Sequence, residues 1–250
     1  MSSPTGRRVV VIMGAGGSLG AALSARFTGE PGTDVVLSDL STDALDTTAA
    51  ALPSERGDVD LVQADVSDPA QVEAVVARAV ERFGRLDVLI SNAGVLTESG
   101  RIHNLGVEDW EKAFRVNVLG AVNGITAAVA VMRAQHSGSI VLTASVAGMT
   151  AWSHSGPYCA TKAAVISLAK VAAIEYARDG IRVNCVCPGT FLSAMHTDLP
   201  PEAIESIRGK HPLGLGAADD LVGAYSYLAS DAAAWTTGSA LVVDGGYSAP

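Results

Sequence analysis

The sequence predicts an α/β fold, a doubly wound parallel sheet of seven strands with helices on both faces. Seven short runs rich in β-branched residues recur along the chain, with helical patterns between them. These runs are apolar throughout instead of alternating, which is typical of strands covered on both faces. The repeated order of strand, helix and strand favours parallel pairing. No linker or repeat divides the 250 residues, of which 48% are apolar, so we expect a single domain over residues 1–250.

The predicted elements follow one another in a regular order. The expected strands are Arg8–Met13, Asp34–Ser38, Val59–Ala64, Leu86–Ser91, Ser139–Thr143, Ile181–Cys187 and Ala240–Val243. The expected helices between and after them are Leu19–Thr28, Thr42–Leu52, Pro69–Phe83, Val107–Arg133, Pro157–Arg178 and Asp219–Leu228. The segment Phe191–Leu215 differs, because prolines and glycines bracket one short helical piece, Glu202–Arg208. A flexible flap over a substrate and an ordinary surface excursion both have this composition.

Charge and hydropathy exclude several classes of partner. The net charge of −9 comes from 17 basic and 26 acidic residues without a block of one sign, so we expect no nucleic acid partner. The longest charge-free runs, Val116–Met132 and Ser137–Thr161, are broken by Asn, Ser, Thr and Gly, so no membrane span is expected. The apolar run after Arg8 is too short for a secretory signal, which favours a cytoplasmic protein. Three cysteines without further ligands at zinc-site spacing indicate no metal site.

A glycine-rich turn follows the first strand. Gly14, Gly16 and Gly20 precede a helix, with Ser18 and Leu19 between them. Backbone N–H groups in such a turn, together with a helix N-terminus, can hold a diphosphate. Neither usual glycine spacing is complete, because Leu19 or Ser18 stands where a glycine is required. Taken alone, the turn is equally typical of a tight strand-to-helix connection.

An acidic residue then bears on the choice of dinucleotide. Asp39 ends the second predicted strand, 19 residues after Gly20, where a carboxylate can accept hydrogen bonds from the adenosine ribose. The same charge repels a 2′-phosphate, and no Arg or Lys adjoins it in the strand end or the glycine turn. The position favours NAD over NADP. Without the preceding glycine turn, Asp39 would be equally consistent with a carboxylate in the first turn of a helix.

A charge-free stretch carries the candidate reactive groups. Lys162 is the first charged residue after Arg133 and follows Tyr158 by four residues. Pro157 sets the helix phase, so we expect the phenol and the ammonium on one face. A fixed cation in a low-dielectric site lowers the pKa of a phenol, which makes Tyr158 a candidate base toward an alcohol. Ser145, at the end of the fifth strand, can donate to the substrate oxygen. A Tyr and a Lys four residues apart also merely pack in many helices.

These motifs, in this order from Val9 to Tyr247, resemble the short-chain dehydrogenase/reductase family. Further matching pieces are Asp65-Val66, Ser91-Asn92-Ala93-Gly94, Asn117, Asn184, Pro188-Gly189 and Val243–Tyr247. The resemblance implies a Rossmann fold that binds a dinucleotide and carries a catalytic tetrad of Asn117, Ser145, Tyr158 and Lys162. It implies cofactor contacts from Gly14, Gly16, Ser18, Leu19, Gly20, Asp39, Asp65, Val66, Asn92, Ala93, Gly94, Tyr158, Lys162, Pro188, Gly189 and Thr190. Met13, Ser18 and Ser91 depart from the family's pattern, and Ser18 bears on cofactor affinity.

The expected reaction is hydride transfer between a secondary alcohol and NAD. By the resemblance, Tyr158 exchanges the proton, Ser145 orients the oxygen, Lys162 binds the nicotinamide ribose and Asn117 supports a water chain. The expected substrate pocket is formed by Leu96, Ser145, Met149, Trp152, His154, Phe191 and Met195. These side chains are mainly apolar or aromatic, with no Arg or Lys among them, which favours a hydrophobic alcohol such as a terpenoid, alicyclic or steroid-like molecule.

The sequence also makes predictions about subunit assembly and leaves alternative functions open. The helix from Pro157 carries more alanine surface than one sheet face needs to cover, and the family resemblance implies a homotetramer. Three alternatives stay open: an NADP-dependent ketoreductase, an NAD-binding protein of the same fold without catalysis, and a cofactor-free lyase. Halohydrin dehalogenases, which resemble this family, represent the lyase alternative and carry Arg where Lys162 stands.

Overall fold

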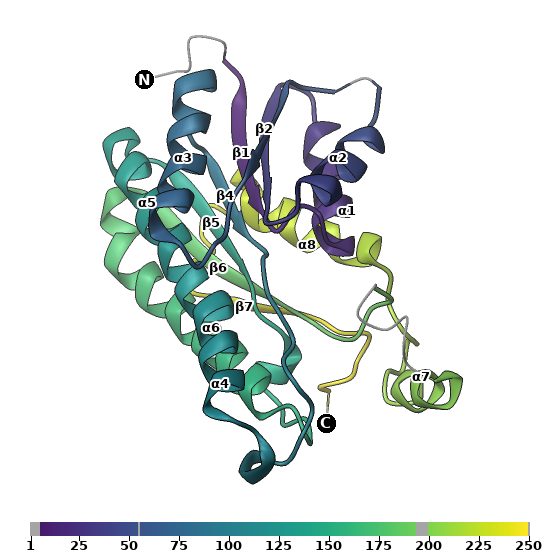
Figure 1. The fold of residues 1–250 in the computed structure, drawn as a ribbon. Coiled ribbons are helices and arrows are strands. Elements are labelled where there is room, and N and C mark those ends of the chain that lie inside the picture. The colour runs from purple at the N-terminus through teal and green to yellow at the C-terminus, as the bar shows by residue number, and fades with distance from the viewer. Residues whose placement is uncertain (1–5, 55, 194–199, 250) are drawn as a thin grey trace.

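One parallel sheet organises the chain, with the strand order β3-β2-β1-β4-β5-β6-β7 (Figure 1). The computed structural model describes residues 6–54, 56–193 and 200–249. Within them, the strands are β1 (Arg8–Met13), β2 (Thr33–Asp39), β3 (Val59–Gln63), β4 (Val88–Ser91), β5 (Gly138–Thr143), β6 (Ile181–Pro188) and β7 (Ala240–Val243). The predicted doubly wound, seven-stranded sheet is therefore confirmed, with small shifts at the strand ends.

Helices cover the sheet on two faces. One face packs against α3 (Pro69–Phe83), α5 (Gly120–Gln135) and α6 (Gly156–Tyr176). The other packs against α1 (Ser18–Thr28), α2 (Thr42–Ala50) and α8 (Ala218–Ala229). In β1, Val9 and Val11 belong to the first core, while Val10 and Ile12 belong to the second. This division explains the continuously apolar inner strands, since both sides of β1 are buried, while the edge strands β3 and β7 are only partly covered.

The region predicted as one helix over Val107–Arg133 contains an irregular turn, which corrects that prediction. Helix α4 (Val107–Ala113) passes into a π-helical turn, η2 (Phe114–Leu119), before α5 begins. A π-helical turn accommodates an extra residue and often marks a functional position. Here it contains the buried side chain of Asn117.

Two helical stretches, Val107–Gln135 and Gly156–Asp179, are long and apolar enough to cross a membrane by length and composition. Both contribute to the hydrophobic core against the sheet, for example through Ala128 and Ala169. A core helix of a soluble domain has the same properties. The prediction that the chain has no membrane partner stays a prediction.

The excursion after β6 stands apart from the sheet. Its helix α7 (Pro201–Arg208) has no buried residue and projects from the body of the molecule (Figure 1). The two ends of the excursion are joined, because Leu192 N donates to Gly216 O at 2.9 Å and Gly216 N donates to Thr190 O at 3.3 Å. Residues 194–199 lie outside the described residues.

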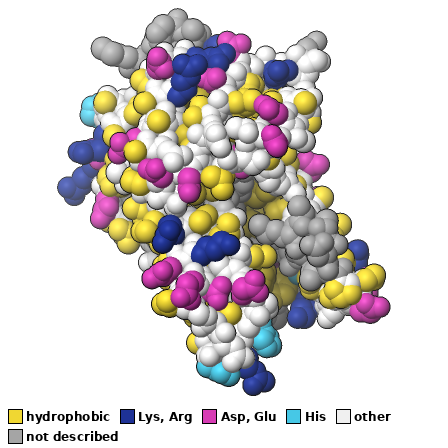
Figure 2. Space-filling model, viewed as in Figure 1, with side chains coloured by type: hydrophobic (Ala, Val, Ile, Leu, Met, Phe, Trp, Pro, Cys, Tyr) yellow, Lys and Arg dark blue, Asp and Glu magenta, His cyan; other side chains and the backbone are white. Residues whose placement is uncertain are grey.

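Charged side chains are scattered over the surface. On the face drawn in Figure 2, basic and acidic groups are interspersed with apolar and polar ones. Cys185 and Cys187 are buried, Cys159 is half-buried, and all three are free thiols. Among the described residues, no group of three or more His, Cys, Asp and Glu side chains is placed to hold a metal.

Candidate active site

Several of the predicted site residues lie at the carboxyl edge of the sheet. Strand β1 pairs with β2 on one side and with β4 on the other, so the direction of winding reverses there. In open α/β sheets this reversal creates a crevice for a ligand. Asp39 ends β2, Ser145 follows β5 and Pro188 ends β6, which brings residues far apart in the sequence to one edge.

The glycine turn after β1 has a shape that larger residues would not allow. Gly14 has a φ of 82°, and a Cβ there would lie 2.6 Å from the Ala93 backbone. A Cβ on Gly20 would collide with the Gly14 carbonyl. Helix α1 begins after Gly17 without a side-chain cap or an acidic residue in its first turn. Backbone N–H groups at such a helix start fit a diphosphate, so the chain fits a dinucleotide here.

The substituted positions of the turn have separate environments. Leu19 is 5% exposed and belongs to the core beside α1, so the side chain that replaces a glycine packs inward. Ser18 is exposed at the first position of the helix. The effect of Ser18 on cofactor affinity stays an open prediction.

Asp39 lies against this turn. Its Oδ2 accepts a hydrogen bond from Gly16 N at 2.8 Å, and its Oδ1 accepts one from Ser41 N at 3.1 Å. A Cβ on Gly16 would approach this carboxylate to 3.1 Å. The structure thus brings the predicted ribose-binding carboxylate to the predicted diphosphate turn.

Two further predicted cofactor segments border the same crevice. Asp65 Oδ1 accepts from Ser67 N at 2.8 Å, and Val66 O accepts from Asn123 Nδ2 at 2.9 Å. These bonds fix the segment that follows β3. Asn92 Nδ2 donates to Gly14 O at 2.9 Å, which joins the segment Asn92-Ala93-Gly94 to the glycine turn.

On the other side of the crevice, Pro188, Gly189 and Thr190 leave β6. The Gly189 N–H donates to Val243 O at 2.9 Å, and Thr190 N donates to His211 Nε2 at 3.1 Å. His211 is buried, and its ring centroid lies 4.8 Å from that of Tyr247. Among the sequence motifs, Tyr247 appears only as the end of the matching piece Val243–Tyr247, and His211 is not singled out, because the contacts of His211 join segments that are distant along the chain.

Tyr158 and Lys162 share one face of α6, as their spacing predicts. The Lys162 Nζ lies 5.6 Å from the centroid of the Tyr158 ring and donates to Thr143 O at 2.8 Å. Lys162 is 3% exposed and Ser145 is 4% exposed. Helix α6 and the end of β5 therefore place the phenol, the ammonium and the hydroxyl in one largely buried region.

The electrostatics of this group correct one prediction. Burial raises the pKa of Tyr158, and its hydrogen bond to Ser145 opposes that effect. Burial also lowers the pKa of Lys162 to about 8. The pKa of Tyr158 is therefore raised in this structure and not lowered as expected, because desolvation of the phenol is the largest effect on it.

Asn117 holds three segments together. Its Oδ1 accepts from Val95 N at 2.8 Å, while its Nδ2 donates to Val95 O at 3.0 Å and to Thr161 Oγ1 at 3.1 Å. A Cβ on Gly94 would lie 3.3 Å from both Asn117 Oδ1 and Lys162 Nζ. The π-helical turn thus anchors the segment after β4 beside the lysine, and the predicted water chain stays a prediction.

The predicted pocket residues occupy different surroundings. Trp152 stacks on Tyr158 with ring centroids 6.1 Å apart, while Leu96 and Met149 are exposed by 44% and 53%. His154 is exposed, and its Nδ1 lies 2.8 Å from Ser153 Oγ. Phe191 lines a separate cavity of about 340 Å³ together with Gly189 and Thr190. Met195 lies outside the described residues.

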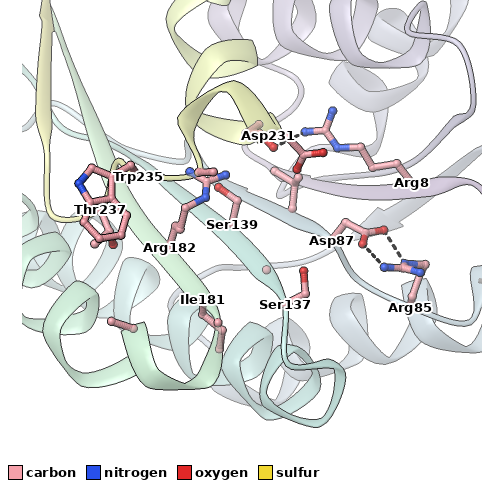
Figure 3. Close-up of a pocket in the computed structure, with 16 residues that line it drawn as sticks. Arg8, Arg85, Asp87, Ser137, Ser139, Ile181, Arg182, Asp231, Trp235 and Thr237 are labelled. Carbon is pink, nitrogen blue, oxygen red and sulfur yellow. Dashed lines mark hydrogen bonds and ion pairs between the residues drawn. The ribbon is translucent and has the colours of Figure 1, made fainter. Parts of the chain in front are cut away.

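A larger cavity, of about 750 Å³, lies at the opposite edge of the sheet (Figure 3). Three arginines line it, but each is already bonded. Arg85 pairs with Asp87, Arg8 donates to Ala229 O at 2.7 Å, and Arg182 donates to Leu228 O at 2.7 Å. Among the described residues that line this cavity there is no Tyr or Lys, the side chains that are grouped at the carboxyl edge.

The chain is similar to known proteins over nearly its whole length. A family model described as enoyl-(acyl carrier protein) reductase matches residues 14–248. The chain is 36% identical over 250 residues to cis-4-hydroxycyclohexanecarboxylate dehydrogenase of Sinomonas cyclohexanicum, covering 100% of both chains. It is 35% identical over 262 residues to levodione reductase of Leifsonia aquatica, covering 99% of this chain and 98% of the relative.

Solved structures agree with these relatives. The crystal structure of levodione reductase matches with a TM-score of 0.91 at 32% identity, covering 97% of this chain and 98% of that one. ElxO with NADP bound and NAD⁺-bound xylitol dehydrogenase each match with a TM-score of 0.90, at 30% and 27% identity. Each covers 96% of this chain and 98% of its own. The fold therefore occurs with either nicotinamide dinucleotide.

Proposed function

We propose a finer function for this chain, which belongs to the short-chain dehydrogenase/reductase family and is an oxidoreductase that acts on alcohols and ketones. In this proposal it interconverts a hydrophobic secondary alcohol and its ketone, with NAD as cofactor and Tyr158 as general acid/base. The observation that carries this proposal is the grouping of Ser145, Tyr158 and Lys162 beside a dinucleotide-shaped glycine turn.

Ser145 is suited to orient the substrate oxygen. Its Oγ accepts a hydrogen bond from Ala147 N at 3.1 Å, so its own proton is available to donate. Its hydrogen bond to Tyr158 directs both hydroxyl groups to the same region. A substrate oxygen bound there would contact the donor and the acid/base together.

The proposed reaction balances as alcohol plus NAD⁺ giving ketone, NADH and a proton. Bound NAD supplies the nicotinamide that accepts or returns the hydride. In the oxidative direction Tyr158 Oη takes the hydroxyl proton, and in the reductive direction it returns a proton to the ketone oxygen. Lys162 holds a positive charge next to this group at pH values below about 8.

The preference for NAD rests on Asp39. The carboxylate ends β2 and is held by Gly16 N and Ser41 N, at the position where family members bind the adenosine ribose. A 2′-phosphate placed there would meet a negative charge. NAD is therefore the proposed cofactor, and an NADP-dependent ketoreductase is the alternative that turnover with each dinucleotide separates.

The proposed substrate is a hydrophobic, alicyclic secondary alcohol. Trp152 extends the apolar surface beside Tyr158 by stacking on it, which suits a ring-shaped carbon skeleton. One relative takes its name from a cyclic compound, a hydroxycyclohexanecarboxylate. The exact alcohol and its stereochemistry are matters for a substrate screen.

We further propose a cytoplasmic homotetramer without nucleic acid or membrane partners. The outer surface of α6 exposes Ile174 by 81% and Val171 by 48%. Apolar side chains on one helix favour contact with another subunit. Chain mass in solution, measured by light scattering, tests the assembly.

The experiment on function compares Tyr158→Phe with Tyr176→Phe, a control at the end of the same helix. NADH binding is followed by fluorescence, and turnover is followed with a panel of cyclic alcohols and ketones. We expect Tyr158→Phe to lose at least about 100-fold in turnover while it still binds NADH, since acid/base catalysis is commonly worth that much. The control should retain both properties.

Each other outcome has a definite meaning. An active Tyr158→Phe variant contradicts the acid/base role. A wild-type chain that binds NADH and converts no alcohol or ketone supports the non-catalytic alternative. Faster turnover with NADP than with NAD contradicts the cofactor assignment.

A further inference from the structure

Tyr225 is a buried phenol that the proposed reaction does not use. It projects from α8 and is fully buried. Its hydroxyl lies 2.8 Å from Thr143 Oγ1. Thr143 ends β5, two residues before Ser145, and its carbonyl accepts the bond from Lys162 Nζ. Tyr225, on the helix layer opposite to α6, thus reaches the end of β5, which lies next to Ser145 and Lys162.

The directions of the hydrogen bonds follow from the atoms involved. The Gly14 carbonyl can only accept, so the Asn92 atom 2.9 Å away is the amide nitrogen, which donates. The other end of that amide is an oxygen, so Thr143 Oγ1 donates its single proton to Asn92 Oδ1 at 3.1 Å. Tyr225 must therefore be the donor to Thr143. The bonds form one chain with a fixed direction.

This chain ends at the glycine turn. Gly14 opens the turn with its left-handed φ, and its carbonyl lies against Gly20 at the start of α1. The carbonyl is held from the other side by Asn92. Removing the first donor leaves an acceptor on Thr143 without its partner, in a place where replacement by water requires room.

We propose that Tyr225 is a positioning residue for dinucleotide binding, which acts through Thr143 and Asn92 on the Gly14 carbonyl. This inference rests on the proposed dinucleotide site. It goes beyond that site by assigning part of its preorganisation to a residue on α8 that is not among the predicted cofactor contacts. The raised pKa of Tyr225, caused by burial, keeps the phenol protonated and able to donate.

The test uses a matched pair on the same helix. Tyr225→Phe and Tyr227→Phe each delete one phenol oxygen, but Tyr227 is 42% exposed and its hydroxyl lies 3.0 Å from Thr236 Oγ1. NADH affinity is measured by fluorescence titration of the unmodified chain and both variants. We expect Tyr225→Phe to weaken NADH binding about three- to tenfold, the range of one neutral hydrogen bond. Tyr227→Phe should bind as the wild type does.

Kinetics separate positioning from general loss of structure. In Tyr225→Phe the KM for NAD should rise while kcat and the KM for the alcohol stay close to wild type. A purely structural role would lower the melting temperature and leave the NADH affinity of the folded fraction unchanged. Unchanged affinity in a folded Tyr225→Phe variant overturns the proposal.

Variants at Thr143 test the chain at its next link and serve if Tyr225→Phe does not fold. Thr143→Ser keeps the hydroxyl and should bind NADH normally, whereas Thr143→Val should weaken it. If the chain is continuous, the double variant Thr143→Val with Tyr225→Phe binds no more weakly than Thr143→Val alone. Additive losses overturn it. If the wild type itself fails to bind NADH, the proposed function fails, which is distinct from these outcomes.

Discussion

Replacing Lys162 by methionine should change how the stability of the protein depends on pH. Lys162 is 3% exposed, and burial lowers its pKa from 10.5 to about 8. Between these two values the unfolded chain binds more protons at this position than the folded chain does. Raising the pH through that window therefore favours the folded state, and the benefit is complete only above the unfolded value.

The size of the effect follows from the two pKa values. One pKa unit corresponds to about 1.4 kcal/mol, so a buried, charged Lys162 costs about 3 kcal/mol near neutral pH. Between about pH 7 and about pH 9.5, the wild type should gain about 2 kcal/mol relative to Lys162→Met. Methionine also loses the hydrogen bond to Thr143 O. That loss lowers the free energy of unfolding of the variant by the same amount at every pH, so it adds no pH dependence.

Urea unfolding, followed by circular dichroism at both pH values, measures the difference. Tyrosines and cysteines also titrate in this range, but they are present in both proteins and cancel to first order. Lys162→Arg, which cannot lose its proton, should show the same absence of slope as Lys162→Met. A wild-type minus variant difference that does not change with pH would refute the depressed pKa of Lys162.

Three other changes address separate parts of the site. Asp39→Asn removes the charge and keeps the shape, so it should reduce the preference for NAD over NADP about tenfold, as measured by kcat/KM with each dinucleotide. Gly20→Ala places a methyl against the Gly14 carbonyl and should weaken NADH binding more than about tenfold. Gly17→Ala, which has open space around its added methyl, is the control in the same NADH titration. Trp152→Ala should raise the KM for a cyclic alcohol several-fold (about 1 kcal/mol) and leave NADH affinity unchanged; an unchanged KM would place the substrate elsewhere.

Much of the fold is predictable because the inner strands of the sheet are buried on both sides. Residues 9 to 13 of β1 are all apolar, and they divide between the two cores in alternation. A run that is apolar on both faces is typical of a strand in the interior of a sheet covered on both sides. The spacing of Tyr158 and Lys162 likewise predicts their common face, because helix geometry alone determines it.

The sequence did not predict the π-helical turn. The residues of Phe114–Leu119 continue the apolar pattern of the flanking helices, and the extra residue changes only the backbone hydrogen bonds. Within the turn, the Asn117 side chain pairs with the Val95 backbone. That pairing joins residues 22 positions apart, which a helical pattern does not contain.

The contacts of Tyr225 illustrate the same limit over a longer distance. Its bond to Thr143 spans 82 positions, and within the sequence Tyr225 is one more apolar position on an amphipathic helix. Its polar end acquires a role only when α8 packs across the end of β5. The sequence thus singles out the proposed reactive groups but not Tyr225, whose contact depends on the packing of α8.

The pKa of Tyr158 also depends on the whole fold, and it bears on the proposed proton transfer. Spacing places a cation near the phenol, but the degree of burial decides which protonation state is favoured, and burial is a property of the whole fold. Here burial moves both groups toward their neutral forms, raising the pKa of Tyr158 and lowering that of Lys162. A phenol that keeps its proton is already the acid that ketone reduction requires. Alcohol oxidation requires that proton to leave, and the bond from Ser145 is the contact in the structure that lowers the pKa of Tyr158 in that direction. In the proposed reaction the single hydroxyl proton of Ser145 therefore serves either the phenolate or the substrate oxygen, and its bond to the phenol favours the base that alcohol oxidation requires.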